Sequence, residues 1–207
     1  SIGCLGPDLV GLDDASVAEP DQTVSVSAAS APTEALGEVL PLGTAGELLL
    51  SGTPDGDTEG SAERSDVARL QVSGARWARG SATGSLAAGF AGSQLGLSLK
   101  EEQRGLTMAA CATAVDDAWF IAGGPEAGRA ERLILANPTA NPVTADVEVF
   151  GADGPVQAVG GRGIVVAPGA RHVVLLDALA PGEERPVFHV STTGGPVLGA
   201  VGDRWLE

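Results

Sequence analysis

The fold class is decided by the stretch Val143-Thr144-Ala145-Asp146-Val147-Glu148-Val149-Phe150, in which apolar and polar residues alternate. Positions 143, 145, 147 and 149 are apolar and point to one side of an extended chain, whereas positions 144, 146 and 148 are polar and point to the other. A strand with one polar face belongs to an antiparallel sheet, because a parallel sheet is normally covered on both faces. The stretch therefore predicts an antiparallel β-sheet with one solvated face.

Short apolar runs recur around this strand, about every ten residues, and turn-forming sequences rich in Asn, Pro, Gly and Asp separate them. The runs are Leu133-Ile134-Leu135, Ile164-Val165-Val166, His172-Val173-Val174-Leu175-Leu176, Val187-Phe188-His189-Val190 and Val197-Leu198-Gly199-Ala200-Val201. This spacing is typical of sandwiches and barrels. We predict an antiparallel, Ig-like or fibronectin-III-like β-sandwich over residues 116–207.

The first half of the chain, residues 1–115, has weaker patterns. Short strand-like runs occur at residues 23–27, 47–50, 67–72, 95–99 and 106–108, and residues 33–40 could form one short helix. Residues 51–66 are rich in Gly, Ser, Thr and acids and predict an exposed loop. We expect an acidic, loop-rich β region that packs against the sandwich.

The net charge of -15 is unevenly distributed. Residues 1–66 hold thirteen of the 27 acidic residues but only one of the twelve Lys and Arg residues, Arg64. Nucleic acids and anionic lipid surfaces are bound through clustered Lys and Arg, so the sequence excludes nucleic acid as a partner. Solubility alone explains an acidic surface, and no specific cation role is needed.

The chain has 30 Gly, no Tyr and three Trp, so its core must consist mainly of Val, Leu and Ala. Burial in the core is the expectation for Trp77, Trp119 and Trp205. Cys4 and Cys111 are the only cysteines, and a bridge between them would close a loop of about a hundred residues. The alternative is two buried thiols, whereas pairing would imply an exported protein.

No catalytic motif is present, so we expect no catalytic residue and no cofactor. The two histidines, His172 and His189, lie on predicted strands, and although Ser191 shares a face with His189, no Gly-x-Ser-x-Gly sequence surrounds it. Two histidines are too few for a zinc site without carboxylate ligands. The paired carboxylates that a glycosidase needs are found only in predicted loops, at residues 13–14, 101–102, 116–117 and 183–184.

One acidic loop has the carboxylate density of a calcium site, with Asp55, Asp57 and Glu59 within five residues. It lacks the twelve-residue spacing and terminal Glu of an EF-hand, and a solvated loop is the alternative reading.

No run of 18 apolar residues occurs, so no segment here is expected to span a membrane. The sequence begins with Ser1 and ends with Leu206-Glu207. We expect a piece of an exported protein whose signal or anchor lies outside it.

The region from Cys111 to Asp203 resembles the actinobacterial DUF5719 family. The resemblance rests on Cys111, Asp117-Ala118-Trp119-Phe120-Ile121-Ala122-Gly123-Gly124, Leu133-Ile134-Leu135-Ala136-Asn137-Pro138, Val147-Glu148-Val149-Phe150-Gly151-Ala152-Asp153-Gly154 and Val166-Ala167-Pro168-Gly169. It implies an exported or membrane-anchored envelope protein and supplies no catalytic residues. Residues 5–105 have no counterpart in this resemblance.

These observations favour a non-catalytic, extracytoplasmic interaction or scaffolding module of the bacterial cell envelope, whose partner is an envelope protein or a glycan. The alternative is a glycan-binding accessory subunit or a glycan-active enzyme, which would show a deep pocket with perturbed carboxylates. A scaffold would instead show a broad apolar surface or an open sheet edge. The sequence does not determine the oligomeric state.

Overall fold

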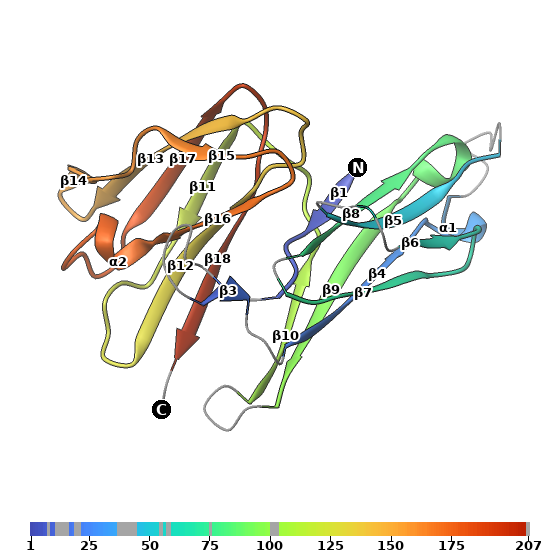
Figure 1. The fold of residues 1–207 in the computed structure, drawn as a ribbon, viewed down its shortest axis with the longest axis horizontal. Helices are drawn as coiled ribbons and strands as arrows, with labels where there is room; N and C mark the ends of the chain where they lie inside the picture. Colours follow the sequence, from blue (N-terminus) through green and yellow to red (C-terminus); the bar gives the residue numbers. More distant parts are fainter. Residues whose placement is uncertain are drawn as a thin grey trace. The chain divides into compact units, whose positions relative to one another are not determined.

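The structure is a computed structural model that describes residues 1–7, 9–10, 17–18, 22–36, 45–53, 56, 59–74, 76–99 and 104–205. Contacts divide the chain into two units, which are described separately (Figure 1). Unit 1 comprises Ser1–Asp8 and Ala18–Thr113, and unit 2 comprises Leu9–Val17 and Ala114–Glu207. The predicted domain boundary between residues 115 and 116, and the predicted packing of the two regions, stay predictions.

The elements are almost all strands. Their bounds in the first half are β1 (Ile2–Cys4), β2 (Leu9–Val10), β3 (Val17–Ala18), β4 (Thr23–Ala29), α1 (Thr33–Leu36), β5 (Leu48–Thr53), β6 (Glu59–Ala62), β7 (Ala68–Val72), β8 (Trp77–Ala82), the 3-10 helix η3 (Gly84–Ala87), β9 (Ala91–Ser98) and β10 (Gly105–Ala110). They continue with β11 (Asp117–Ile121), β12 (Arg129–Ala136), β13 (Val143–Gly151), β14 (Gly154–Val156), β15 (Ile164–Val166), β16 (Arg171–Leu175), α2 (Leu176–Leu179), β17 (Val187–Thr193) and β18 (Leu198–Trp205).

Unit 1 contains two four-stranded antiparallel sheets, with strand orders β1-β8-β5-β6 and β10-β9-β4-β7. Period-two patterns build its core, because alternate residues of β4 (Val24, Val26, Ala28) and β5 (Leu48, Leu50) are buried. Trp77 is completely buried, as predicted.

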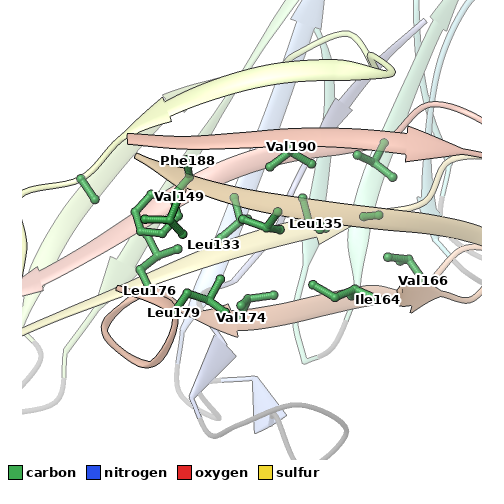
Figure 2. Packing of buried hydrophobic residues seen from close by; sticks show 14 of the residues in the cluster. Leu133, Leu135, Val149, Ile164, Val166, Val174, Leu176, Leu179, Phe188 and Val190 are labelled. Carbon is green, nitrogen blue, oxygen red and sulfur yellow. The ribbon is translucent and has the colours of Figure 1, made fainter. Parts of the chain in front are cut away.

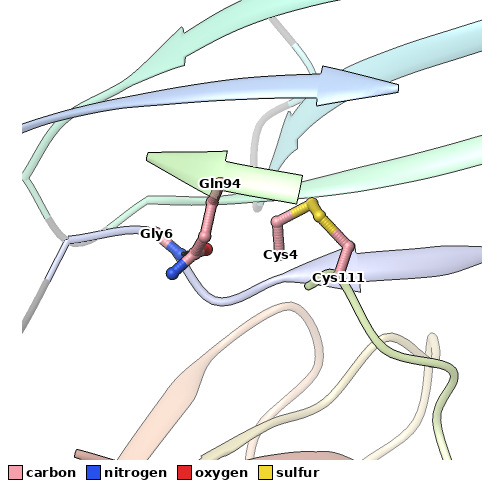
Figure 3. Close-up of a disulfide and its surroundings, with 4 residues drawn as sticks. All are labelled: Cys4, Gly6, Gln94 and Cys111. Atoms are coloured by element: carbon pink, nitrogen blue, oxygen red, sulfur yellow. Dashed lines mark hydrogen bonds between the residues drawn. A yellow bond between two sulfur atoms is a disulfide. The ribbon is translucent and has the colours of Figure 1, made fainter. Parts of the chain in front are cut away.

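A disulfide joins Cys4 and Cys111 and so ties β1 to the segment that follows β10 (Figure 3). Both residues belong to the unit 1 core, and Gly3 and Ala112 exchange backbone hydrogen bonds beside them. A Cβ on Gly92 of β9 would lie 3.3 Å from the Cys111 sulfur and 2.7 Å from the end of the Ile2 side chain, so the packing around the bridge is tight at this glycine. Two residues after Cys4, the backbone amide of Gly6 donates a hydrogen bond to Oε1 of Gln94 at 2.9 Å.

Unit 2 contains a larger antiparallel sheet with strand order β11-β17-β13-β14, in which β15 also pairs with β13, and a smaller antiparallel sheet with the order β16-β12-β18. Both sheets contribute to one core, in which Leu133 and Leu135 from the smaller sheet lie against Val149, Phe188 and neighbouring residues of the larger one (Figure 2). The buried residues of β13 are Val143, Ala145, Val147 and Val149, which confirms the alternation predicted for this strand.

The all-β, antiparallel prediction is confirmed, but the strand order of unit 2 departs from the immunoglobulin order. In an immunoglobulin domain, the first strand pairs with the second and the last strand pairs with the one before it. The equivalent pairs in unit 2 would be β11 with β12 and β18 with β17. Here the first strand, β11, pairs with β17, and the last, β18, pairs with β12. Within residues 33–40 the structure describes only a four-residue helix, α1. In the described part of the chain, no helix is long and apolar enough to cross a bilayer.

Candidate functional site

The open edge of unit 1 is strand β10. Its backbone pairs only with β9 in the described part of the chain, and all six of its residues are exposed. At the opposite edge of the same sheet, β7 contacts β6 of the neighbouring sheet. In the described part of the chain, the β10 edge of this sheet is therefore open for further strand pairing.

The surface beside this edge is apolar. Leu106 and Met108 of β10 are 67% and 79% exposed, and they lie opposite Leu97 and Leu95 of β9, which are also exposed. Residues 105–115 carry no charged side chain. Natural edge strands are usually protected by charges, prolines or bulges, so this uncharged apolar edge is a candidate binding surface.

Unit 2 presents a different surface on the outer side of its larger sheet. Strand register arranges nine outward side chains in three rows across β11, β17 and β13. The rows are Asp117, Ser191 and Asp146; Trp119, His189 and Glu148; and Ile121, Val187 and Phe150. The face therefore changes from acidic to apolar along the strands.

Trp119 lies in the middle row of this surface, on the edge strand β11, and we call the surface the Trp119 face. Its indole ring stacks on the imidazole of His189, with ring centroids 4.3 Å apart and planes 19° apart. The ring of Phe150 lies 5.3 Å away, tilted by 39°. Trp119 is nevertheless 57% exposed, so the expectation that it lies in the core is wrong.

His189 is held by carboxylates from both neighbouring strands. Its Nε2 lies 2.7 Å from Oδ2 of Asp117, and its Nδ1 lies 3.4 Å from Oε2 of Glu148. The hydrogen bond with Asp117 is the largest cause and raises the pKa of His189 above its usual value of about 6.5. Burial opposes this rise, and the hydrogen bond with Glu148 adds a smaller increase. These bonds stabilise the fold below about pH 6.5, and that contribution is lost as the pH rises through the folded pKa.

A charged cluster closes one end of the unit 2 core and has a structural role. Glu131 is 2% exposed and accepts hydrogen bonds from the amides of Gly123 and Gly124 at 2.8 and 2.9 Å. Gly124 has a φ of +86°, and a Cβ there would collide with the backbone oxygen of Glu184. Glu131 thus fixes a turn that only glycine allows.

Arg129 completes the cluster. Its guanidinium donates two hydrogen bonds to Asp203, at 2.9 and 2.6 Å, and lies 3.1 Å from Glu131 and 4.8 Å from the centre of the Trp205 ring. The pKa of Asp203 is lowered by these hydrogen bonds. Trp205 is 51% exposed, so its expected place in the core is also wrong. A groove of about 700 Å³ opens beside Arg129, but Nε and Nη2 of Arg129 already bind Asp203 and Glu131 within the cluster.

The other predicted site residues that the structure describes belong to separate elements. Asp55 and Asp57 lie outside the described residues, and Glu59 belongs to β6. Asp117 lies in β11 and not in a loop as expected. His172 is in β16, and the ring nitrogens of His189 contact Asp117 and Glu148 and not Ser191. Among the described residues, no group of three or more His, Cys, Asp or Glu side chains could hold a metal ion.

Comparison with known proteins identifies the family. The model of DUF5719, a family of unknown function, matches residues 67–207, which is more than half of the chain. The chain belongs to the DUF5719 family. The DUF5719 match begins well before Cys111 and covers β7 to β18, so it includes both the β10 edge and the Trp119 face. No curated protein matches the chain.

Two matching structures come from infectious bursal disease virus. The chain of the T13 viral particle has 10% identity and a TM-score of 0.23, and the alignment covers 99% of this chain and 65% of the viral one. The Gx strain structure has 12% identity, a TM-score of 0.20, and coverage of 99% and 57%. The chain spans less than two thirds of either viral chain, and similarity at this level supports no inference about the DUF5719 chain.

Proposed function

We propose that the chain is a non-catalytic, exported interaction module of the bacterial cell envelope. In this proposal, an extended segment of a partner envelope protein binds along β10 and adds a strand to the sheet. The observation that carries the proposal is the open β10 edge, with Leu106 and Met108 exposed beside it. Unpaired backbone groups give affinity to such strand addition, and pockets for alternate side chains give specificity.

The apolar side chains beside the edge support a binding role. Burying a Leu or Met side chain stabilises an interface by about 1.5 to 3 kcal/mol. Leu95, Leu97, Leu106 and Met108 together supply enough apolar surface to favour a partner that covers them.

The compartment follows from the cysteine chemistry. Disulfides such as Cys4–Cys111 persist in oxidising compartments and are rare in the reducing cytosol, which supports an extracytoplasmic location.

For unit 2, we propose a variant of the immunoglobulin-like sandwich in which the first and last strands have exchanged sheets.

A second candidate function is glycan binding, and one observation favours it. The ring of Trp119 is exposed on a flat sheet face, with Asp117 and Glu148 beside it. A sugar ring could stack on the indole while its hydroxyl groups donate to the carboxylates.

Site-specific photo-cross-linking in the native host tests the proposal. A photoreactive amino acid replaces Leu106 or Met108 in the full-length protein, and Val159 serves as the control position because it is 80% exposed and lies outside β10. We expect one envelope protein to be cross-linked at positions 106 and 108 and not at 159, with the cross-links on one continuous segment of that protein.

A matched pair of variants checks that the cross-linked product at positions 106 and 108 results from specific binding. L106K/M108K places charges beside the edge and should abolish co-purification of the cross-linked protein, whereas V159K should leave it unchanged. Equal adducts at all three positions would overturn the proposal. So would recovery of a defined glycan without a protein, which would favour the second candidate.

A further inference from the structure

The Trp119 face differs from the β10 edge in its chemistry, and that chemistry defines a ligand. We propose that Trp119 and Asp117 bind a cationic group carried on an aliphatic stem, namely an arginine or lysine side chain in a basic segment of a partner protein. This site lies in unit 2 and is additional to the strand-pairing surface of unit 1.

The arrangement of the face matches the two parts of such a side chain. Ile121 and Trp119 follow one another on the outer side of β11, and Asp117 continues the same line. A stem lying along β11 would contact the apolar side chains, and its charged end would reach the carboxylate. Arg and Lys side chains bind in this way, with the stem on an apolar surface and the charge in a polar one.

The indole ring is already held in place. Stacking on His189 and contact with Phe150 fix its orientation before any ligand arrives, although more than half of its surface stays exposed. A ligand therefore meets a rigid ring and does not have to order it, which removes one cost of binding. A cation over an aromatic face is attracted by the ring quadrupole.

The charges on the face favour a cation. Asp117 is 64% exposed, and Asp146 and Glu148 add two further carboxylates on the same face. Arg162 lies 3.6 Å from Glu148, and His189 is the other basic residue of the face. Three carboxylates thus face one arginine and one histidine, which leaves the surface negative around Trp119.

The excess of carboxylates on the Trp119 face favours a basic side chain over a neutral sugar as the ligand. Both would stack on Trp119 and could hydrogen-bond the carboxylates, but only the cation is also attracted by their charge, and its binding must weaken as salt screens that attraction. Asp117 contacts His189 through Oδ2, and its Oδ1 makes no hydrogen bond with another described residue. A guanidinium or ammonium group can use that second oxygen.

Titrations followed by the NMR signal of the Trp119 indole N–H test the proposal on the whole chain. The probes are hexa-arginine, hexa-citrulline, which keeps the stem but is neutral, and a neutral hexamer of β-1,4-linked N-acetylglucosamine. We expect a saturating shift with hexa-arginine only. W119A, read from the neighbouring backbone amides, should weaken binding about three- to fivefold.

D117N and D153N form the decisive pair, because both remove one negative charge but only Asp117 lies beside Trp119. We expect D117N to weaken hexa-arginine binding about threefold or more, and D153N to leave it nearly unchanged. Thermal melting of each variant shows that it is folded. Equal losses in the two variants would mean diffuse attraction and would overturn the proposal, as would salt-independent binding of the sugar hexamer in place of hexa-arginine.

Discussion

The imidazole of His189 lies stacked beneath the indole of Trp119, 4.3 Å between ring centroids, while its two nitrogens contact carboxylates of the strands on either side. One residue therefore supports the exposed ring and links β11, β17 and β13 on the outer face of the sheet. The protonation state of His189 is thus coupled to the carboxylates that surround Trp119.

Replacing Asp117 with Asn should lower the pKa of His189 toward its ordinary value, because the hydrogen bond with Asp117 is the largest cause of the raised pKa. E148Q should lower it less, since its contact of 3.4 Å is longer. NMR titration of the imidazole protons measures both values. An unchanged pKa in D117N would mean that the contact is not maintained in solution.

The D177N variant should be more stable than the parent at pH 7. Burial, and then the negative charge of Glu131, raises the pKa of Asp177 in α2, so the folded state disfavours its ionised form. The increase in the free energy of unfolding should be complete above the raised pKa that Asp177 has in the folded state. It should disappear as the pH falls through the pKa of an unfolded Asp, about 3.9. Urea denaturation from pH 3 to pH 7 measures it, and a gain that persists at pH 3 would contradict this cause.

E131A should lower the free energy of unfolding by about 3 kcal/mol, because it leaves Arg129 without one of its buried partners and two glycine amides without an acceptor. E126A removes an exposed carboxylate from the same loop and should change stability by less than about 0.5 kcal/mol. Chemical denaturation compares the two variants. Equal effects would show that Glu131 does not fix the turn.

Removing the disulfide in C4A/C111A should destabilise unit 1. The chain-entropy model assigns about 4 to 5 kcal/mol to a loop of this length, given the separation of 107 residues. Denaturation of the parent with reductant should reproduce the loss, and reductant should not affect the variant. Equal stability of oxidised and reduced parent protein would contradict a structural role for the bridge.

The parts of the fold that could be predicted are those set by local alternation. In β13 each apolar residue faces the core, and the pattern alone identifies the strand and its buried side. In β9 the alternation identifies the strand, but Leu95 and Leu97 face outward while Gly96 and Ser98 are buried. An apolar pattern shows that two faces differ and does not show which one the rest of the protein covers.

The candidate site was harder to predict for a related reason. Residue type suggested a buried Trp119, although the alternation in β11 places it on the same side as Asp117, which was the available signal. Arg129 and Asp203 are 74 residues apart, and only the pairing of β12 with β18 brings them together. Register between distant strands is not encoded in a local pattern, so neither this cluster nor the open edge at β10 could be derived from the sequence.

Hydrogen exchange at β10 is the most direct measurement of the proposed function. Exchange is compared by mass spectrometry between the chain alone and the complex recovered from its native host, with β7 at the other edge of the same sheet as the internal reference. We predict that backbone amides of residues 105–110 exchange at least about tenfold more slowly in the complex, because a partner strand pairs with them, while β7 is unchanged. A complex in which other segments exchange more slowly than in the chain alone, but β10 does not, would contradict the proposal.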